Sequence, residues 1–206
     1  SKLESWSTCA LRTFLDSNGG VSESTEPMRV GIFIHAIAEQ IVQGMDLDEA
    51  QLAVREILPH VLDGPAWKDA HTVARWEKGV KKLHDFITGY SDQELETERT
   101  LRAHVGQTAD GVEVTLSGRA DLLVTNPEDG LTQVIDFKTG KNAVSKKTAA
   151  ESPQLSAYQF LLTLTERPGC GAQKYRPGSA KLAYPGTETQ SIVVRDQVQP
   201  VSYTHL

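Results

Sequence analysis

The chain of 206 residues is poor in cysteine and has no long apolar segment. Its two cysteines, Cys9 and Cys170, are too few for a disulfide framework and cannot by themselves supply the four ligands of a tetrahedral metal site. No segment reaches the roughly 18 to 20 apolar residues of a membrane span, and no basic segment followed by an apolar one resembles a signal peptide. These absences argue against a small secreted protein and a membrane protein, and we expect a cytoplasmic protein.

Positive charge is also scarce. Lys and Arg number 21 against 27 Asp and Glu, so the formal net charge is −6. This balance disfavours a protein that coats nucleic acid, because affinity for the phosphate backbone comes from accumulated Lys and Arg. The distribution is uneven, however, since residues 138–147 contain four lysines and no acid, whereas residues 46–56 and 92–98 are acidic. The local sign of the charge decides which ligand a surface attracts.

Neither end of the chain resembles the natural end of a protein. The chain begins without methionine, and residues 3–15 already have the spacing of an amphipathic helix, so we expect an upstream region in a longer protein. The segment PVSYTHL, residues 200–206, matches the translation of a sequencing-transposon end, and we interpret it as an artefact. We therefore predict one domain over residues 1–199, which is long enough to bury a substantial core.

The first half of the chain is expected to be helical. Apolar residues recur at helical spacing in residues 3–15, 28–45, 47–58 and 66–90. Alternating apolar and polar residues then predict strands, followed by one helix at 151–164 and two late strands. The predicted strands are residues 97–105, 112–116, 122–124, 134–136, 180–184 and 192–194. This order predicts an α/β or α+β fold with a central mixed β-sheet flanked by helices.

The segment GRADLLVTNPEDGLTQVIDFKTG, residues 118–140, predicts a hairpin that brings charged side chains together. A turn centred in NPEDG pairs residues whose numbers add up to 257, so Asp121 is expected opposite Asp136. Directly opposed side chains lie about 4.5 to 5.5 Å apart at Cβ, where two carboxylates repel each other unless a cation lies between them. Lys138 follows Asp136 by two residues and therefore shares its face of the strand. The pattern predicts that two acids and a lysine converge.

Simpler interpretations exist for each part of this pattern. The acids could end their strands in solvent, with Lys138 in a surface ion pair worth roughly 0 to 1 kcal/mol. A register shift of one residue would separate the acids. His35 and Glu39 share one face of a predicted helix, as do Gln154 and Tyr158, but each pair alone is also typical of an ordinary helix boundary.

Taken together, the motifs resemble the PD-(D/E)XK nuclease superfamily in its RecB-like exonuclease branch. The ordered set is G-x-x-x-H-x-x-x-E, GRADLLV, IDFKTGK and Q-x-x-x-Y-Q, and it is more specific than any one member. The resemblance covers nearly the whole chain and implies a restriction-endonuclease-like core. The opening, with CALRTFLDSNGG, is most similar to the C-terminal nuclease domains of actinobacterial helicase-nucleases of the UvrD/Rep and AdnAB type. Two departures are Ala10, where Pro often follows the cysteine, and GRAD in place of GRID or GRVD.

The resemblance implies roles for the matched residues. His35, Asp121, Asp136 and the backbone carbonyl of Phe137 would bind a divalent metal. Asp121, Asp136 and Lys138 would be catalytic. Mg²⁺ is expected because it favours carboxylates and water, and the histidine makes Mn²⁺ the alternative.

Further residues are implied around this centre. Glu39 would lie behind the metal ligands, and Gln154 and Tyr158 would support the site and contact DNA. Three lysines would hold flanking phosphates, with a solvated loop as the alternative: Lys141, Lys146 and Lys147. Cys9 stands where several relatives have one ligand of a [4Fe-4S] cluster, so such a cluster is expected only if three further cysteines follow the present chain.

The implied function is that of a metal-dependent DNA exonuclease domain acting in double-strand break repair. Its substrate would be single strands produced by helicase motor domains of the same polypeptide, with a second helicase-nuclease subunit as a further partner and no membrane. One alternative is an inactive nuclease-like module for DNA binding or scaffolding, and another is a standalone Cas4-like nuclease. The intact set of His35, Asp121, Asp136 and Lys138 favours the active enzyme, because an inactive copy is free to lose a member.

Overall fold

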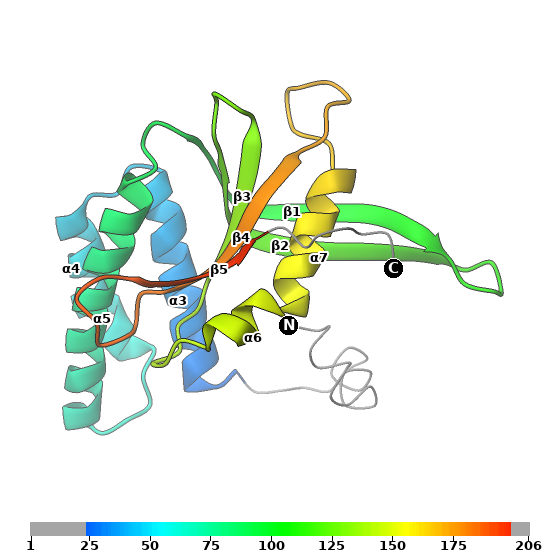
Figure 1. Ribbon diagram of the computed structural model, residues 1–206. Helices are drawn as coiled ribbons and strands as arrows, with labels where there is room; N and C mark the ends of the chain where they lie inside the picture. The colour runs from blue at the N-terminus through cyan, green and yellow to red at the C-terminus, as the bar shows by residue number, and fades with distance from the viewer. Residues whose placement is uncertain (1–23, 199–206) are drawn as a thin grey trace.

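The computed structural model describes residues 24–198, which form one mixed β-sheet with helices on both faces (Figure 1). The predictions for residues 3–15, Cys9 and residues 200–206 therefore fall outside the described residues. The helices are α3 (Glu26–Val42), α4 (Leu47–Ile57), the 3₁₀ helix η1 (Leu58–His60), α5 (Ala66–Thr88), α6 (Lys146–Ala150) and α7 (Pro153–Leu164). The strands are β1 (Glu94–Gln107), β2 (Glu113–Thr125), β3 (Leu131–Phe137), β4 (Arg176–Tyr184) and β5 (Val193–Val198).

The strands lie in the sheet in the order in which they occur in the chain. Within the described residues the order is β1-β2-β3-β4-β5, and only the β3–β4 pair is parallel. The connection between these two strands contains α6 and α7, because parallel strands need a long crossover. This arrangement confirms the predicted α/β fold with a central mixed sheet.

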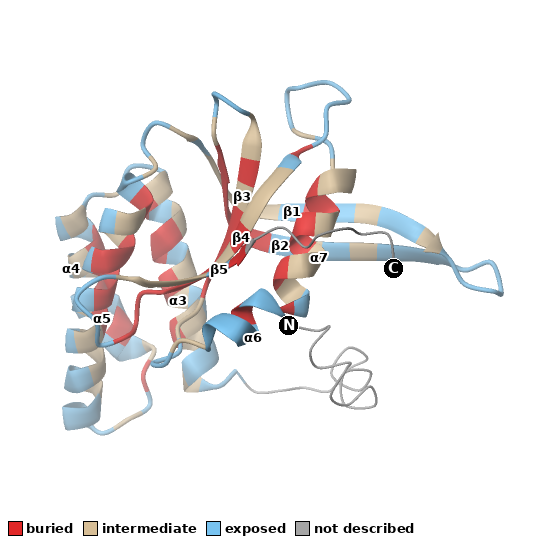
Figure 2. Cartoon of the chain, in the orientation of Figure 1, coloured by how far each residue is buried: buried red, intermediate tan, exposed pale blue. Residues whose placement is uncertain are grey.

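Two hydrophobic cores cover the two faces of the sheet. On one face, α3, α4 and α5 pack against Leu122, Val124 and Ile135. On the other face, α7 packs against Leu123 and Val134. Successive side chains of a strand point to opposite faces, so a strand covered on both sides is apolar at every position, as in the LLV segment of β2. Figure 2 shows this buried centre, and it also shows that the distal parts of β1 and β2 extend beyond the helices and are exposed.

The helix α3 places one site residue at the edge of its buried stripe. The helix begins with Pro27 in its first turn, a position where the missing N–H costs nothing. Its buried residues, Val30, Ile34, Ile37, Ala38 and Ile41, follow helical spacing. His35 is half-buried beside this stripe, where its ring reaches the end of β3.

Several predicted boundaries differ from those of the structure. Residues 112–116 and 122–124 belong to one strand, because β2 pairs with β1 on both sides of Asp121, through Gly118, Arg119 and Ala120 of its polar segment. Lys146 and Lys147 begin α6 instead of lying in a loop, and the Ser145 side chain caps that helix by accepting the Thr148 N–H. The helix predicted at 151–164 begins at Pro153, since the preceding residues form the bend between α6 and α7.

Candidate active site

The register predicted for the β2–β3 hairpin is confirmed. The paired residue numbers add up to 257 from Thr125–Thr132 to Leu122–Ile135, where this ladder ends. Beyond it, β3 continues to pair with β4 on its other side, with Asp136 beside Leu182. Asp121 and Asp136 are thus the residues at which β2 and β3 separate.

Asp121 fills the gap that opens between the two strands. Its Oδ2 accepts the backbone N–H of Phe137 at 2.7 Å, and its Oδ1 lies 3.2 Å from Nδ1 of His35. The other ring nitrogen of His35, Nε2, lies 3.2 Å from the carbonyl oxygen of Phe137. Because a carboxylate and a carbonyl both accept hydrogen bonds, the imidazole must carry a proton on each nitrogen to satisfy both contacts. Burial opposes that charged form, but the hydrogen bond and charge of Asp121 outweigh it, and the pKa of His35 is raised.

Glu98 of β1 is the site residue that the sequence interpretation missed. Its carboxylate lies 4.0 Å from Nδ1 of His35 and forms an ion pair with Arg119. Its backbone is in the left-handed region, with φ of 52°, and the β1–β2 ladder is interrupted at this residue between the Thr97–Leu122 and Arg99–Ala120 pairs. This conformation is uncommon outside glycine, and residues that adopt it cluster at active sites and binding sites.

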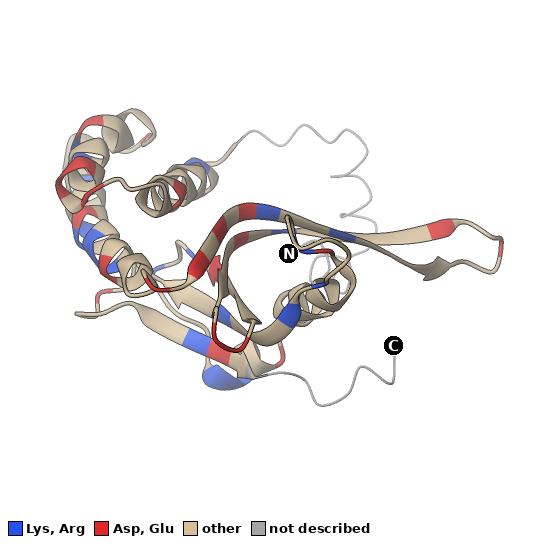
Figure 3. Cartoon of the chain, turned by 90° about the horizontal axis from the view of Figure 1, so that it is seen from above, with Lys and Arg blue, Asp and Glu red and all other residues tan. Residues whose placement is uncertain are grey.

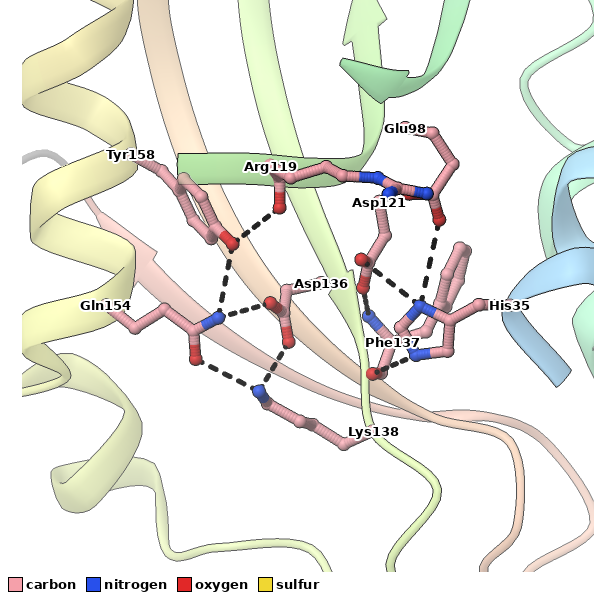
Figure 4. Close-up of polar contacts among 9 residues, drawn as sticks. All are labelled: His35, Glu98, Arg119, Asp121, Asp136, Phe137, Lys138, Gln154 and Tyr158. Carbon is pink, nitrogen blue, oxygen red and sulfur yellow. Dashed lines mark hydrogen bonds and ion pairs between the residues drawn. The ribbon is translucent and has the colours of Figure 1, made fainter. Parts of the chain in front are cut away.

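Glu98 completes a group of possible metal ligands. Among residues 24–198, one ligand atom each from His35, Glu98 and Asp121 lie within 4.8 Å of one another. Figure 4 shows these side chains converging from α3, β1 and β2 on the end of β3.

Asp136, predicted as a metal ligand, belongs to a neighbouring network that faces α7 (Figure 4), and its binding of a metal stays a prediction. Its Oδ2 lies 2.7 Å from Nζ of Lys138, and its Oδ1 accepts a hydrogen bond of 2.6 Å from Nε2 of Gln154. Lys138 also donates to Oε1 of Gln154 at 3.0 Å. The Tyr158 hydroxyl lies 3.3 Å from Nε2 of Gln154 and donates to the backbone carbonyl of Arg119. The helix α7 therefore fixes the positions of the acid and the lysine of the D-x-K motif.

Comparison with known proteins identifies the family. The family model PDDEXK_1, of the PD-(D/E)XK nuclease superfamily, matches residues 1–204. The chain belongs to the PD-(D/E)XK nuclease superfamily. No curated protein matches it. Among the solved structures that match is one described as "Crystal structure of SSO0001", with 16% sequence identity and a TM-score of 0.40, covering 85% of this chain and 80% of that chain.

In a PD-(D/E)XK nuclease the donor set must suit a divalent metal, and this one does. Carboxylate and carbonyl oxygens suit Mg²⁺, and an imidazole suits Mn²⁺. Ligands of an octahedral Mg²⁺ at 2.0–2.1 Å are about 3 Å from their neighbours. The 3.2 Å between Nδ1 of His35 and Oδ1 of Asp121 matches that spacing, so a cation in place of the Nδ1 proton can have both atoms as ligands. The Phe137 carbonyl lies at the other ring nitrogen, and its binding of the same cation stays a prediction. Identity of the metal stays a prediction.

The structure places the remaining predicted residues around this centre. Glu39 lines a cavity of about 490 Å³ together with His35, Glu98 and Arg119, and its carboxylate accepts a hydrogen bond from Gln43. On the other side of the site, Lys138 and Gln154 line a cavity of about 550 Å³. The side chains of the three further lysines are exposed and line neither cavity: Lys141, Lys146 and Lys147. Their predicted contact with DNA stays a prediction.

Asp136 is a buried carboxyl group with a raised pKa. Burial and the negative charge of Asp121 raise the pKa of Asp136 to about 6, against the opposing effect of Lys138. Burial and the charge of Asp136 also raise the pKa of Tyr158, so its hydroxyl keeps its proton. Without a metal, the negative charges of Asp121 and Asp136 therefore repel each other, and a bound cation would reduce this repulsion.

Lowering the pH from about 7.5 to about 5.5 is expected to stabilise the metal-free protein. As the pH falls through about 6, folded Asp136 takes up a proton that the unfolded chain, with a pKa of 3.8, does not bind, so the free energy of unfolding rises. His35 acts in the same direction because its pKa is raised in the folded state. We expect a gain of about 1 kcal/mol from Asp136, or about 2 to 4 °C in Tm. Thermal unfolding in EDTA measures it, and an equal gain in Asp136→Asn would contradict the assignment.

Proposed function

We propose that the chain is the metal-dependent DNA exonuclease domain of a larger helicase-nuclease. The observation that carries this proposal is the position of the group His35, Glu98 and Asp121 beside the Asp136–Lys138 pair. Membership of the PD-(D/E)XK nuclease superfamily supports the proposal. Both features favour hydrolysis of a phosphodiester, because a cation at the phosphate stabilises the developing charge and a cationic side chain orients the attacking water.

The side chains divide this work between the two networks. A bound Mg²⁺ or Mn²⁺ would supply charge stabilisation at phosphorus and would lower the pKa of a bound water. His35, Glu98 and Asp121 would hold the cation, and Asp121 also positions the end of β3 by accepting the backbone N–H of Phe137. On the other side, Asp136 and Gln154 hold the ammonium group of Lys138 at the cavity, where it orients water and adds positive charge.

The finer parts of the proposal rest on the motif resemblance. The helicase-type opening supports an attached motor, a second helicase-nuclease subunit, single-stranded DNA ends as substrate and a role in double-strand break repair. Lys141, Lys146 and Lys147 would hold flanking phosphates of that strand. Cys9 would bind a [4Fe-4S] cluster only in a longer protein that supplies three more cysteines.

Incubation of the intact parent protein with DNA tests the activity. In Mg²⁺ or Mn²⁺, linear single-stranded DNA is expected to be degraded, closed circular single strands to persist, and EDTA to stop the reaction. Cutting of the closed circles would replace the exonuclease assignment with an endonuclease. Binding of DNA without cutting in either metal would favour the scaffolding module.

Glu98→Gln is expected to weaken the response to metal. Removing one anionic ligand lowers the affinity for a hard cation. Loss of the Glu98–Arg119 ion pair should have little further effect, because the Arg119 side chain is largely exposed. Saturating Mn²⁺ stabilises the wild type by about 2.7 kcal/mol at 100 times its Kd, and we expect the concentration needed for the same rise in Tm to increase at least about tenfold. Glu113→Gln, at an exposed position of β2, is the matched control. An unchanged Mn²⁺ titration would remove Glu98 from the ligand group.

A further inference from the structure

A second group of cationic side chains lies at a cavity away from the candidate active site. The cavity, of about 380 Å³, lies between α5 and the loop that follows β4. Its charged and polar lining includes Arg75, Lys78 and Lys82 of the helix and Thr187, Glu188 and Thr189 of the loop. Among the described residues, this cavity shares no lining residue with the two cavities beside the candidate active site.

Arg75 has buried hydrogen-bond donors without acceptors. In the described part of the chain, Nε and Nη1 of Arg75 are buried and have no hydrogen-bond partner. The guanidinium lies over the ring of Trp76, with Cζ 5.1 Å from the ring centre, which orients its plane but satisfies no N–H group. A buried unsatisfied donor is costly, and a planar guanidinium is best satisfied by an oxyanion that accepts two parallel hydrogen bonds.

Lys82 brings a second charge to the same cavity. Lys82 as a whole residue is only 8% exposed, and its Nζ donates to the carbonyl oxygens of Thr187 at 2.6 Å and Thr189 at 3.4 Å. These bonds fix the loop and use two of the three ammonium hydrogens. Burial and the positive charge of Arg75 lower the pKa of Lys82. Two cations that repel each other in this way are stabilised by an anion between them.

The remaining charges at the cavity leave it positive. Lys78 is exposed at its edge, and Glu188 is the acid of the lining, so three cations face one carboxylate. Over the helices of Figure 3, Lys and Arg are interspersed with Asp and Glu, so the positive charge at this cavity is local. A protein with a net charge of −6 gains affinity for phosphate only at such local groups.

We propose that Arg75, Lys78 and Lys82 form a phosphate-binding site. The site would bind the DNA backbone at a point distant from the bond that is cut. A further cavity of about 600 Å³ shares the 187–189 loop with this one and is lined by Lys141 and Arg195. Lys141 in turn follows Gly140, which lines the cavity at Lys138. Basic side chains therefore accompany the loop from the candidate active site to the cluster. The inference rests on the proposed function, because it takes DNA as the source of the phosphates.

Affinity for a single-stranded oligonucleotide tests the site. In EDTA, Arg75→Gln/Lys78→Gln is expected to raise Kd about tenfold. Between about 50 and about 200 mM salt, the negative slope of log K against log salt is expected to become less steep by about 1.4, the value for two lost phosphate contacts on a single strand. In Mg²⁺ the KM of hydrolysis rises similarly while kcat stays within about twofold, because these residues do not touch the reacting atoms. Lys78→Gln alone, at an exposed position, tests the site if the double variant does not fold.

Lys81→Gln is the matched control. Lys81 lies on the same helix, is exposed, does not line the cavity and pairs with Asp85 at 2.9 Å, so its substitution removes one charge, as Lys78→Gln does, from outside the site. An equal loss of affinity in Lys81→Gln, or no loss in the double variant, would overturn the proposal. A titration with inorganic phosphate, followed by tryptophan fluorescence, separates the sources: a response that depends on Arg75 without any change in DNA affinity would overturn the assignment to DNA. Wild-type protein that binds DNA but never cuts it would contradict the proposed function and leave this test intact.

Discussion

Replacing Asp136 with asparagine is expected to lower the rate of DNA hydrolysis by about 10³-fold or more while DNA binding is retained. Asparagine keeps the shape of the side chain but has no charge. The Asp136 carboxylate that it replaces holds Lys138 and contributes negative potential at the metal group. Loss of several kcal/mol of transition-state stabilisation corresponds to this change in rate. The measurement is the initial rate of release of nucleotides from linear DNA in Mg²⁺ and in Mn²⁺.

The same variant is expected to be more stable than the wild type when metal is absent. Above pH 6 the folded wild type keeps a buried carboxylate whose pKa is raised to about 6, and this charge opposes folding. Its removal should raise Tm in EDTA at about pH 7.5, so inactivity cannot be attributed to unfolding. Asp110→Asn, at the exposed turn between β1 and β2, is the control and should change neither quantity. Nuclease activity at the wild-type rate in Asp136→Asn would reject the proposed mechanism.

Replacing Lys138 with alanine is expected to lower the hydrolysis rate by about 10² to 10⁴-fold, the range for loss of a positioned acid or base. The variant also leaves the Asp136 carboxylate without its cation, so stability in EDTA should fall at neutral pH, in contrast to Asp136→Asn. Single-turnover cleavage and thermal unfolding measure the two effects. Lys174→Ala, at an exposed position between α7 and β4, is the charge-matched control.

The double variant Asp136→Asn/Lys138→Ala separates the structural from the chemical role of the lysine. Because the buried carboxylate is absent, removal of Lys138 should no longer reduce stability, whereas the rate stays low. If Lys138→Ala retained a rate within about tenfold of the wild type, the lysine would serve only to neutralise Asp136.

The sequence predicted one half of the site through the geometry of a short hairpin. The NPEDG turn fixes the β2–β3 register, so Asp121 and Asp136 were placed correctly at the end of that ladder. The prediction that both acids and Lys138 converge on one point holds for Asp136, which pairs with Lys138, whereas Asp121 has other partners. The strands separate at these residues, and Asp121 bonds to Phe137 and His35 while Asp136 bonds to Lys138 and Gln154. The partners that split the acids come from helices whose packing a sequence pattern does not specify.

Glu98 could not be found by the same counting. Near the β1–β2 turn the paired numbers add up to 220, as in Gln107–Glu113, which would place Glu98 opposite Leu122. An irregularity between His104 and Gly106 changes the sum to 219, as in Thr97–Leu122, and only then does Glu98 face Asp121. Such bulges shift every later pair by one residue and leave only a weak signal in sequence, here a glycine at position 106.

The parallel pairing of β3 with β4 has a consequence for the time at which the nuclease becomes active. The last residues of β3 are held by β4, with Asp136 beside Leu182 and Phe137 beside Ala183. During synthesis, β3, α6 and α7 leave the ribosome before β4, and a parallel partner so distant in sequence pairs slowly. We therefore expect nascent chains that stop before β4 to bind metal poorly and to leave nearby nucleic acid uncut. Completion of the domain, and not the appearance of its acidic residues, would then determine when nuclease activity begins.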